Sequence, residues 1–244
     1  PRPYLLGKKE FSILKFLIII PIVFILSLGS YLIIDRVYPM IKYVLLDREQ
    51  KELREKLENV YLFEGLEEGK IPESAKSPTY SPREVAEMFD KAKKNMRSAS
   101  VNEAVMIING ALESDINDYL KERFRVLKNF VIAPDYNIFK ESPDYLTVVK
   151  NYNLYEGGFI KWKADVSGIS KTNIDGVPKN KARLLIYDNN GKEIVGVADL
   201  IYSQNISLET KSHIEVYAKI LGYDNLSRAV LLDTQIIKHL PNKK

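Results

Sequence analysis

Residues 16–34 form the most constraining feature of the sequence, an apolar run of nineteen residues, FLIIIPIVFILSLGSYLII, without a charged side chain. As an α-helix this run would be about 28 Å long, close to the roughly 30 Å hydrocarbon core of a bilayer. Lys15 precedes it, and Asp35 and Arg36 follow it, so charged residues flank both ends. The pattern predicts a transmembrane helix over residues 16–34, preceded by a short basic tail over residues 1–15.

The run has two other interpretations. A cleavable signal peptide would have an apolar centre over residues 16–26 and a small-residue exit at Ser27 and Gly29. The run continues to Ile34, which favours an uncleaved anchor. A buried helix of a soluble protein usually carries a polar stripe, and this run has none.

Lysine and arginine are about equally frequent on the two sides of the run, so the positive-inside rule gives no clear orientation. A short basic N-terminus followed by one span commonly stays in the cytoplasm. We therefore expect a single-pass protein of the plasma (inner) membrane, with a cytoplasmic N-terminus and an extracytoplasmic C-terminal domain.

Residues 35–63 continue with apolar positions at helical spacing and many charged residues of both signs. This pattern predicts a juxtamembrane helical stem that is solvated, or alternatively a short coiled coil or a packing face for neighbouring subunits. Residues 64–80 contain Gly, Pro, Ser and charge without periodicity, which is typical of a linker.

Residues 81–155 begin with Ser81-Pro82-Arg83-Glu84, a capping box with proline at the first helical position. Ser100 and Glu103 have the same spacing ahead of a longer amphipathic pattern. We therefore expect two helices, over residues 82–96 and 101–129, whose apolar faces pack against the β domain that follows.

From Phe159 the apolar spacing changes from helical to alternating, as in FIKWKADVSGI. Four further strands are expected over residues 183–188, 193–202, 213–223 and 229–240, and Asn190-Gly191 provides a tight turn between the second and third. Residues 156–244 therefore form a predicted five-stranded all-β domain, and the chain as a whole is expected to be α+β.

The order of these features resembles an OB-fold barrel: a long first strand ending near Gly168, a hairpin, the polar crossover SQNISLETKS, then IEVYAKILGY and a last strand. In particular, it resembles the small OB-type domains of bacterial membrane-anchored proteins of unknown function. Many OB barrels insert a helix between the third and fourth strands, and no such helix is predicted here. An immunoglobulin-like sandwich therefore remains the alternative.

The resemblance implies a binding surface of aromatic and basic side chains on strands two and three. Residues that could contact a ligand or partner there or on the first strand are Lys161, Lys163, Arg183, Tyr187 and Tyr202. Trp162 shares the apolar face with Ile160, so we expect it in the core, whereas the two lysines that alternate with it should face water.

No motif of catalysis or metal binding is present in the sequence. Cysteine is absent, and His213 and His239 are the only histidines; neither has the spacing of a paired metal ligand. There is no Gly-rich phosphate loop and no nucleophile elbow. We therefore expect no enzyme activity, no catalytic residue, no metal and no cofactor.

The formal net charge of +4 is spread evenly along the chain, which disfavours nucleic acid as a partner. The expected partners are the lipid bilayer and other envelope proteins or copies of the chain itself. The expected function is that of a scaffold or accessory subunit of a cell-envelope assembly. The alternative is an OB-type module that binds an oligosaccharide or single-stranded nucleic acid.

Overall fold

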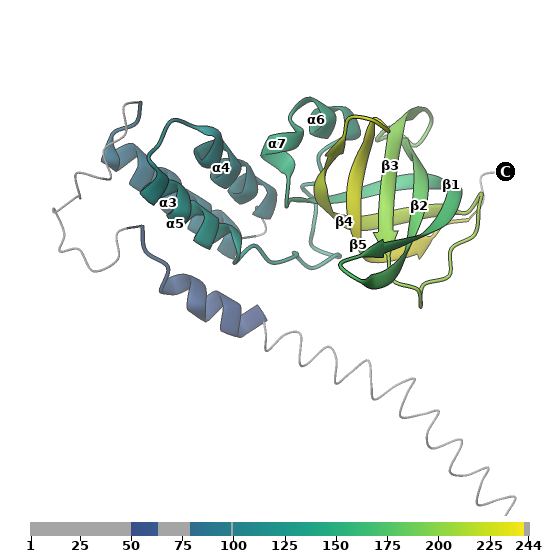
Figure 1. Cartoon of the computed structure of the whole chain (residues 1–244), viewed down its shortest axis with the longest axis horizontal. Helices are drawn as coiled ribbons and strands as arrows, with labels where there is room; N and C mark the ends of the chain where they lie inside the picture. The colour runs from purple at the N-terminus through teal and green to yellow at the C-terminus, as the bar shows by residue number, and fades with distance from the viewer. Residues whose placement is uncertain (1–49, 63–78, 99, 242–244) are drawn as a thin grey trace, which may run out of the picture. The chain divides into compact units, whose positions relative to one another are not determined.

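The structure of the protein is a computed structural model that describes residues 50–62, 79–98 and 100–241 (Figure 1). The described residues from Lys56 onward belong to one compact unit. The tail over residues 1–15, the predicted span over residues 16–34, the first half of the predicted stem (residues 35–49) and most of the linker lie outside the described residues. Within the described part, no helix combines the length and apolar character that a membrane crossing requires.

Helix α3 (Pro82–Arg97) begins at the capping box that the sequence predicts. The Ser81 side chain accepts a hydrogen bond from the Glu84 N–H, and the Glu84 carboxylate accepts one from the Ser81 N–H at 2.7 Å. Two of the N–H groups that a helix start leaves without partners are thereby satisfied. The start of this helix is confirmed.

The single helix expected over residues 101–129 is wrong, because the chain breaks between α4 (Val101–Glu113) and α5 (Asp118–Lys128). Asn117 starts the second helix, since its side chain accepts a hydrogen bond from the Leu120 N–H at 2.9 Å. The capping box expected at Ser100 is also wrong: its hydroxyl donates to Glu141 instead and makes no cap hydrogen bond.

The helices pack mainly on one another rather than on the β domain. Phe89 of α3 and Phe124 of α5 meet edge to face, with ring centroids 5.3 Å apart. The end of the predicted stem joins this helical core through Leu57, Val60 and Leu62, which are all buried. This part of the stem is therefore not solvated on all sides.

Two short helices, α6 (Tyr145–Lys150) and α7 (Tyr152–Tyr155), lead into the β domain and were not predicted. The five strands are β1 (Phe159–Ile174), β2 (Val177–Tyr187), β3 (Ile194–Tyr202), β4 (His213–Asp224) and β5 (Ala229–His239). They close into one barrel in the order β1-β2-β3-β5-β4, with β3 and β5 parallel.

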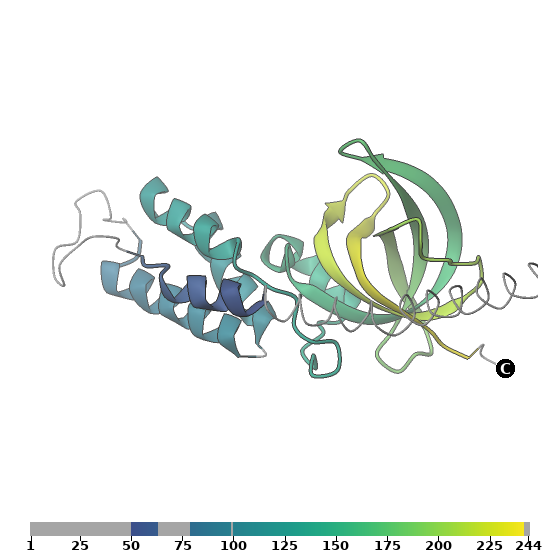
Figure 2. The same ribbon diagram turned by 90° about the horizontal axis from the view of Figure 1, so that it is seen from below.

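The closed barrel excludes the sandwich alternative, and its strand order is compatible with an OB-like fold. Figure 2 shows the strands wrapping around a common interior. The fold is α+β, with a few helices followed by this barrel.

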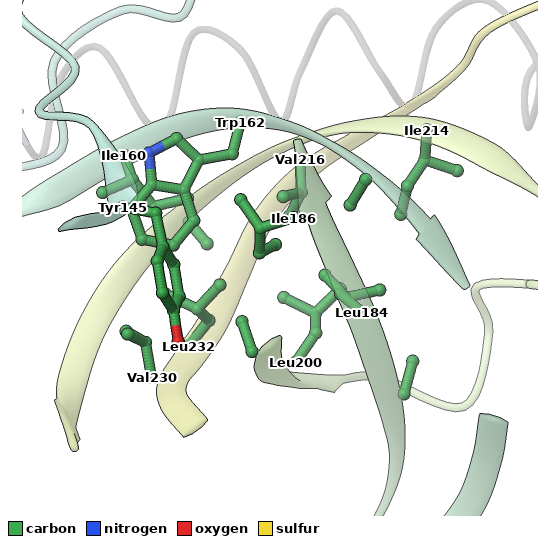
Figure 3. Packing of buried hydrophobic residues seen from close by; sticks show 14 of the residues in the cluster. Tyr145, Ile160, Trp162, Leu184, Ile186, Leu200, Ile214, Val216, Val230 and Leu232 are labelled. Carbon is green, nitrogen blue, oxygen red and sulfur yellow. The ribbon is translucent and has the colours of Figure 1, made fainter. Parts of the chain in front are cut away.

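Apolar side chains from outside the strands join the core of the barrel. They are Tyr145 and Val148 of α6 and Leu208 of the β3–β4 connection. Tyr145 lies against Trp162, with ring centroids 5.6 Å apart (Figure 3). A helix that precedes the barrel thus supplies a plug, while the β3–β4 connection contains no helix.

Candidate functional site

The outer face of β2 carries a row of cations because its side chains alternate. Ala182 and Leu184 point into the barrel and are fully buried, so Lys181 and Arg183 point outward. Arg183 lies directly opposite Asp199 of β3, which is also on the outer face.

Asp199 binds two cations although its own side chain is fully buried. Arg183 donates from Nε to Oδ1 at 2.9 Å and from Nη2 to Oδ2 at 3.0 Å, and Lys181 Nζ lies 2.8 Å from Oδ2. Burial alone would raise the pKa of this carboxyl, but hydrogen bonds and charge from Arg183 and Lys181 outweigh it and hold the pKa below its usual value. Asp199 is therefore an ionised carboxylate at neutral pH.

A second, looser ion pair continues this charged face to β5. Lys179 Nζ lies 3.9 Å from Asp233 Oδ1, and both side chains are about one-third exposed. Three cations of β2 thus face two carboxylates on β3 and β5. Asp224 of β4 adds a third negative charge that acts on Lys181 and Arg183.

A hollow of about 310 Å³ lies beside these charges on the outer face of β1–β3. It is lined by Gly168, Ile169, Ser170, Lys181, Arg183 and Asp199. A Cβ atom added at Gly168 would meet nothing within 4 Å, so the space over this residue is open. The hollow is thus lined by two cations and by the carboxylate that pairs with both of them.

Tyr187 shares the outer face of β2 but belongs to a different network. Its hydroxyl donates to Asp165 Oδ2 at 2.6 Å, and His213 Nδ1 lies 2.7 Å from Asp165 Oδ1. The hydrogen bond to Asp165, together with burial and the negative charge, raises the pKa of the Tyr187 hydroxyl. These three residues connect β2, β1 and β4 on the outside of the barrel.

The two lysines of β1 have different surroundings. Lys161 is half-buried: its ammonium donates to the Tyr136 carbonyl at 3.2 Å and lies 3.9 Å from the centroid of the Tyr136 ring. Lys238 covers the same ring at 3.6 Å. Lys163 is exposed, so the expectation that both lysines face water holds for it alone.

The aromatic candidates lie mostly inside the barrel. Tyr202 is only 3% exposed and Trp162 only 5%, and both belong to the barrel core. The Trp162 indole N–H donates to the Pro143 carbonyl at 2.7 Å. The expectation that Trp162 is a core residue is confirmed, and Tyr202 is placed where a ligand on the outer face cannot reach it.

Of the five candidates, only Arg183 takes part in the charged hollow. Lys181 and Asp199, which complete it, were not predicted. The alternation of Lys179, Lys181 and Arg183 along β2 is a signal that could have identified the cations, whereas the position of Asp199 depends on the strand register. In the described part of the chain, no group of three or more His, Asp or Glu residues is arranged to hold a metal ion.

Comparison of the chain with protein-family models gives no match, and comparison with curated protein sequences gives none either.

Proposed function

We propose that this chain is a non-catalytic, single-pass membrane protein that acts as a scaffold or accessory subunit of a cell-envelope protein assembly. Its helical part and its barrel are the modules that dock other proteins. The barrel is proposed to be an OB-type domain like those of bacterial membrane-anchored proteins, in line with its strand order.

The observation that carries this proposal is the position of the aromatic side chains. Domains that bind single strands or sugars offer exposed rings on which bases or sugar rings stack. Here Trp162 and Tyr202 are buried in the barrel core, and the Tyr187 hydroxyl is bound to Asp165. The outer face of β2 and β3 carries charged groups together with the exposed apolar side chains Val177 and Ile194, a mixture that suits a protein interface.

The apolar run over residues 16–34 supports the membrane part of the proposal, because its length matches one bilayer crossing. A reporter fused after Lys244 and read from each side of the membrane tests the orientation. A signal from the cytoplasmic side would contradict an extracytoplasmic barrel.

Crosslinking of the full-length protein, followed by detergent solubilisation and purification, tests the assembly role. Stoichiometric protein partners, or further copies of the chain, are expected in the crosslinked product. Recovery of a lone monomer at every crosslinker concentration would contradict the proposal.

A second candidate function is binding of an oligosaccharide or single-stranded nucleic acid, favoured by the hollow beside Lys181 and Arg183. Binding of glycans or oligonucleotides that is lost on Lys181→Ala and Arg183→Ala would support it. Unchanged binding in both variants would exclude this surface.

A further inference from the structure

The hairpin between β1 and β2 extends past the strands that flank it. β1 pairs with β4 from Phe159 to Asp165, and Val166 then exchanges backbone hydrogen bonds with Ser212 and Lys211. From Gly168 to Ile174, β1 pairs with β2 alone. We call residues 168–179 the arm; it lies at the margin of the barrel (Figures 1 and 2).

One edge of the arm is open along its length. Among the described residues, no strand pairs with the side of β1 that faces away from β2 between Gly168 and Ile174. Proline, which removes a backbone donor and so blocks strand pairing, is absent from this stretch. The opposite edge, on β2, carries Pro178. An unpaired edge of this kind is a template for an added strand.

The side chains of the arm define the chemistry that this edge would accept. Residues directly opposite each other share one face of a sheet, and three such pairs are Gly168 with Arg183, Ser170 with Lys181 and Thr172 with Lys179. On this face, small side chains therefore line the open edge, and a row of cations lies one strand behind them.

This arrangement leaves the cations accessible from the edge. Strands lie about 4.8 Å apart, so the side chains of an added strand would be roughly 10 Å from the backbone of β2. Nothing lies within 4 Å of a Cβ at Gly168 to block the approach, and the 310 Å³ hollow opens at this point. Lysine and carboxylate side chains together span that separation.

The charges favour an acidic occupant. Lys181 and Arg183 share the carboxylate of Asp199 and also feel the charge of Asp224, whereas Lys179 reaches Asp233 only at 3.9 Å. A carboxylate arriving from the open edge would give Lys179 a closer partner. The arm also exposes two apolar side chains, Ile169 at 41% and Val177 at 55%.

We propose that the edge of β1 from Gly168 to Ile174 binds an extended segment of a partner protein as an added strand, with acidic side chains alternating with apolar ones. The acidic side chains lie over the small residues of β1 and pair with the cations of β2. The proposal rests on the protein-docking function above. It places that function at the edge of β1 and specifies the side chains of the segment that binds there.

A fluorescein-labelled decapeptide of alternating Glu and Val, added to the full-length protein, tests this proposal by fluorescence anisotropy and by hydrogen exchange. Binding is expected, with slower exchange of the backbone amides of residues 168–174. The same peptide N-methylated at every second residue should not bind, because it lacks the backbone N–H groups that would hydrogen-bond to the edge of β1. A peptide of alternating Lys and Val should not bind either.

Two substitutions at Gly168 distinguish the effect of a negative charge on peptide binding from the effect of side-chain size. Gly168→Asp places a fixed carboxylate beside Arg183 that competes with the peptide, and it should weaken binding about tenfold. Gly168→Asn has the same size without the charge and should bind like the wild type. Lys179→Glu should weaken binding to a similar extent, whereas Lys192→Glu, an exposed lysine of the β2–β3 turn, should not.

The proposal would be overturned if the N-methylated peptide bound as tightly as the unmodified one. It would also be overturned if the peptide slowed hydrogen exchange only at amides outside residues 168–174. Tight binding of a single-stranded oligonucleotide that depends on Lys179 but leaves these amides unprotected would also overturn it. If crosslinking still recovers protein partners when the peptide fails to bind, the edge assignment alone is wrong. If crosslinking recovers only the monomer, the docking function itself fails.

Discussion

Asn102 of α4 and Phe159 of β1 exchange a pair of hydrogen bonds between the helices and the barrel. The Asn102 side-chain amide donates to the Phe159 carbonyl at 2.9 Å, and the Phe159 N–H donates to Asn102 Oδ1 at 2.8 Å. The same amide also donates to the Glu141 carbonyl at 2.9 Å. Two turns further along α4, the side-chain amide of Asn109 donates to the carbonyls of Leu154 and Glu156, each at 2.9 Å. Two asparagines on one helix thus hold the segment that enters the barrel.

Replacing Asn102 with alanine should lower the free energy of unfolding by about 2–4 kcal/mol, because the buried Phe159 N–H loses its acceptor. Urea unfolding followed by the fluorescence of Trp162, the only tryptophan, measures this change. Asn129→Ala, at an exposed asparagine, is the matched control and should change stability by less than about 0.5 kcal/mol. Equal effects of the two substitutions would contradict the role assigned to Asn102.

Gly196 faces the ring of Tyr145, and this contact should tolerate no side chain. A Cβ at position 196 would lie 2.0 Å from Tyr145 Cε1, far inside van der Waals contact. Gly196→Ala should therefore destabilise the barrel by at least about 2 kcal/mol. Thermal unfolding of this variant, of Tyr145→Ala and of the double variant gives the coupling between the two sites.

A smaller loss in the double variant than the two single losses together would show that the clash is the cause. Gly168→Ala is the matched control, because no atom lies within 4 Å of its Cβ position. A similar loss of stability at Gly168 would mean that backbone freedom, and not the Tyr145 ring, explains the effect.

The pair between Asp199 and its cations should make stability depend on pH in the acid range. The pKa of Asp199 is lower in the folded protein than in the unfolded chain, where it is about 4. Its contribution to the free energy of unfolding is therefore present above about pH 4 and is lost as the pH falls through the lower folded pKa. Asp199→Asn should cost about 1–2 kcal/mol at pH 7, since both cations can still reach water.

The difference between the wild type and Asp199→Asn should shrink below about pH 4, as measured by urea unfolding across the pH range. Asp233→Asn, which removes a partner at 3.9 Å on an accessible surface, should show little change at any pH. A difference for Asp199→Asn that stays constant down to pH 2 would argue against an ionised carboxylate at this position.

The apolar run over residues 16–34 should keep the full-length chain in the membrane. The chain is expected to remain with the membrane fraction in alkaline carbonate, because an integral helix resists extraction. A variant lacking residues 1–36 should be released into the supernatant. Release of the full-length chain under the same conditions would contradict the anchor.

The sequence predicts the last three strands closely because their apolar residues alternate over long stretches, whereas β2 begins at Val177, six residues before the expected start. The bounds expected for the third, fourth and fifth strands differ from those of β3, β4 and β5 by no more than a residue at each end. The first hairpin is longer than expected: β1 continues to Ile174, and the turn lies at Asp175 and Gly176, both at positive φ. Polar residues in the arm hide the alternation there, because both faces are accessible.

The helices show where local patterns fail. The amphipathic spacing continues from α4 into α5, so the sequence predicts one helix where a cap at Asn117 begins a second. The break allows Phe124 to fold back against Phe89, a gain in packing that no local pattern contains. The Ser100 hydroxyl likewise finds Glu141, which is distant in sequence.

The charged hollow depends on one irregularity in the β2–β3 ladder. Counted from the pair of Tyr187 with Ile194 next to the turn, an unbroken ladder would place Arg183 opposite Ala198. The register shifts between Ile186 and Tyr187, and Arg183 therefore lies opposite Asp199. A shift of one residue exchanges the two faces of a strand, so the irregularity places Asp199 outside and Ala198 inside the barrel.

The sequence by itself determined the apolar run, the α+β order, the strands and the start of α3, because each depends on neighbours within a few residues. The tertiary structure decided the closure of the barrel, the plug from α6, the union of Asp199 with two cations and the open edge of the arm. These features depend on register and on contacts between distant segments. The contacts that stabilise them form between residues that are distant in sequence and that meet only in the completed fold.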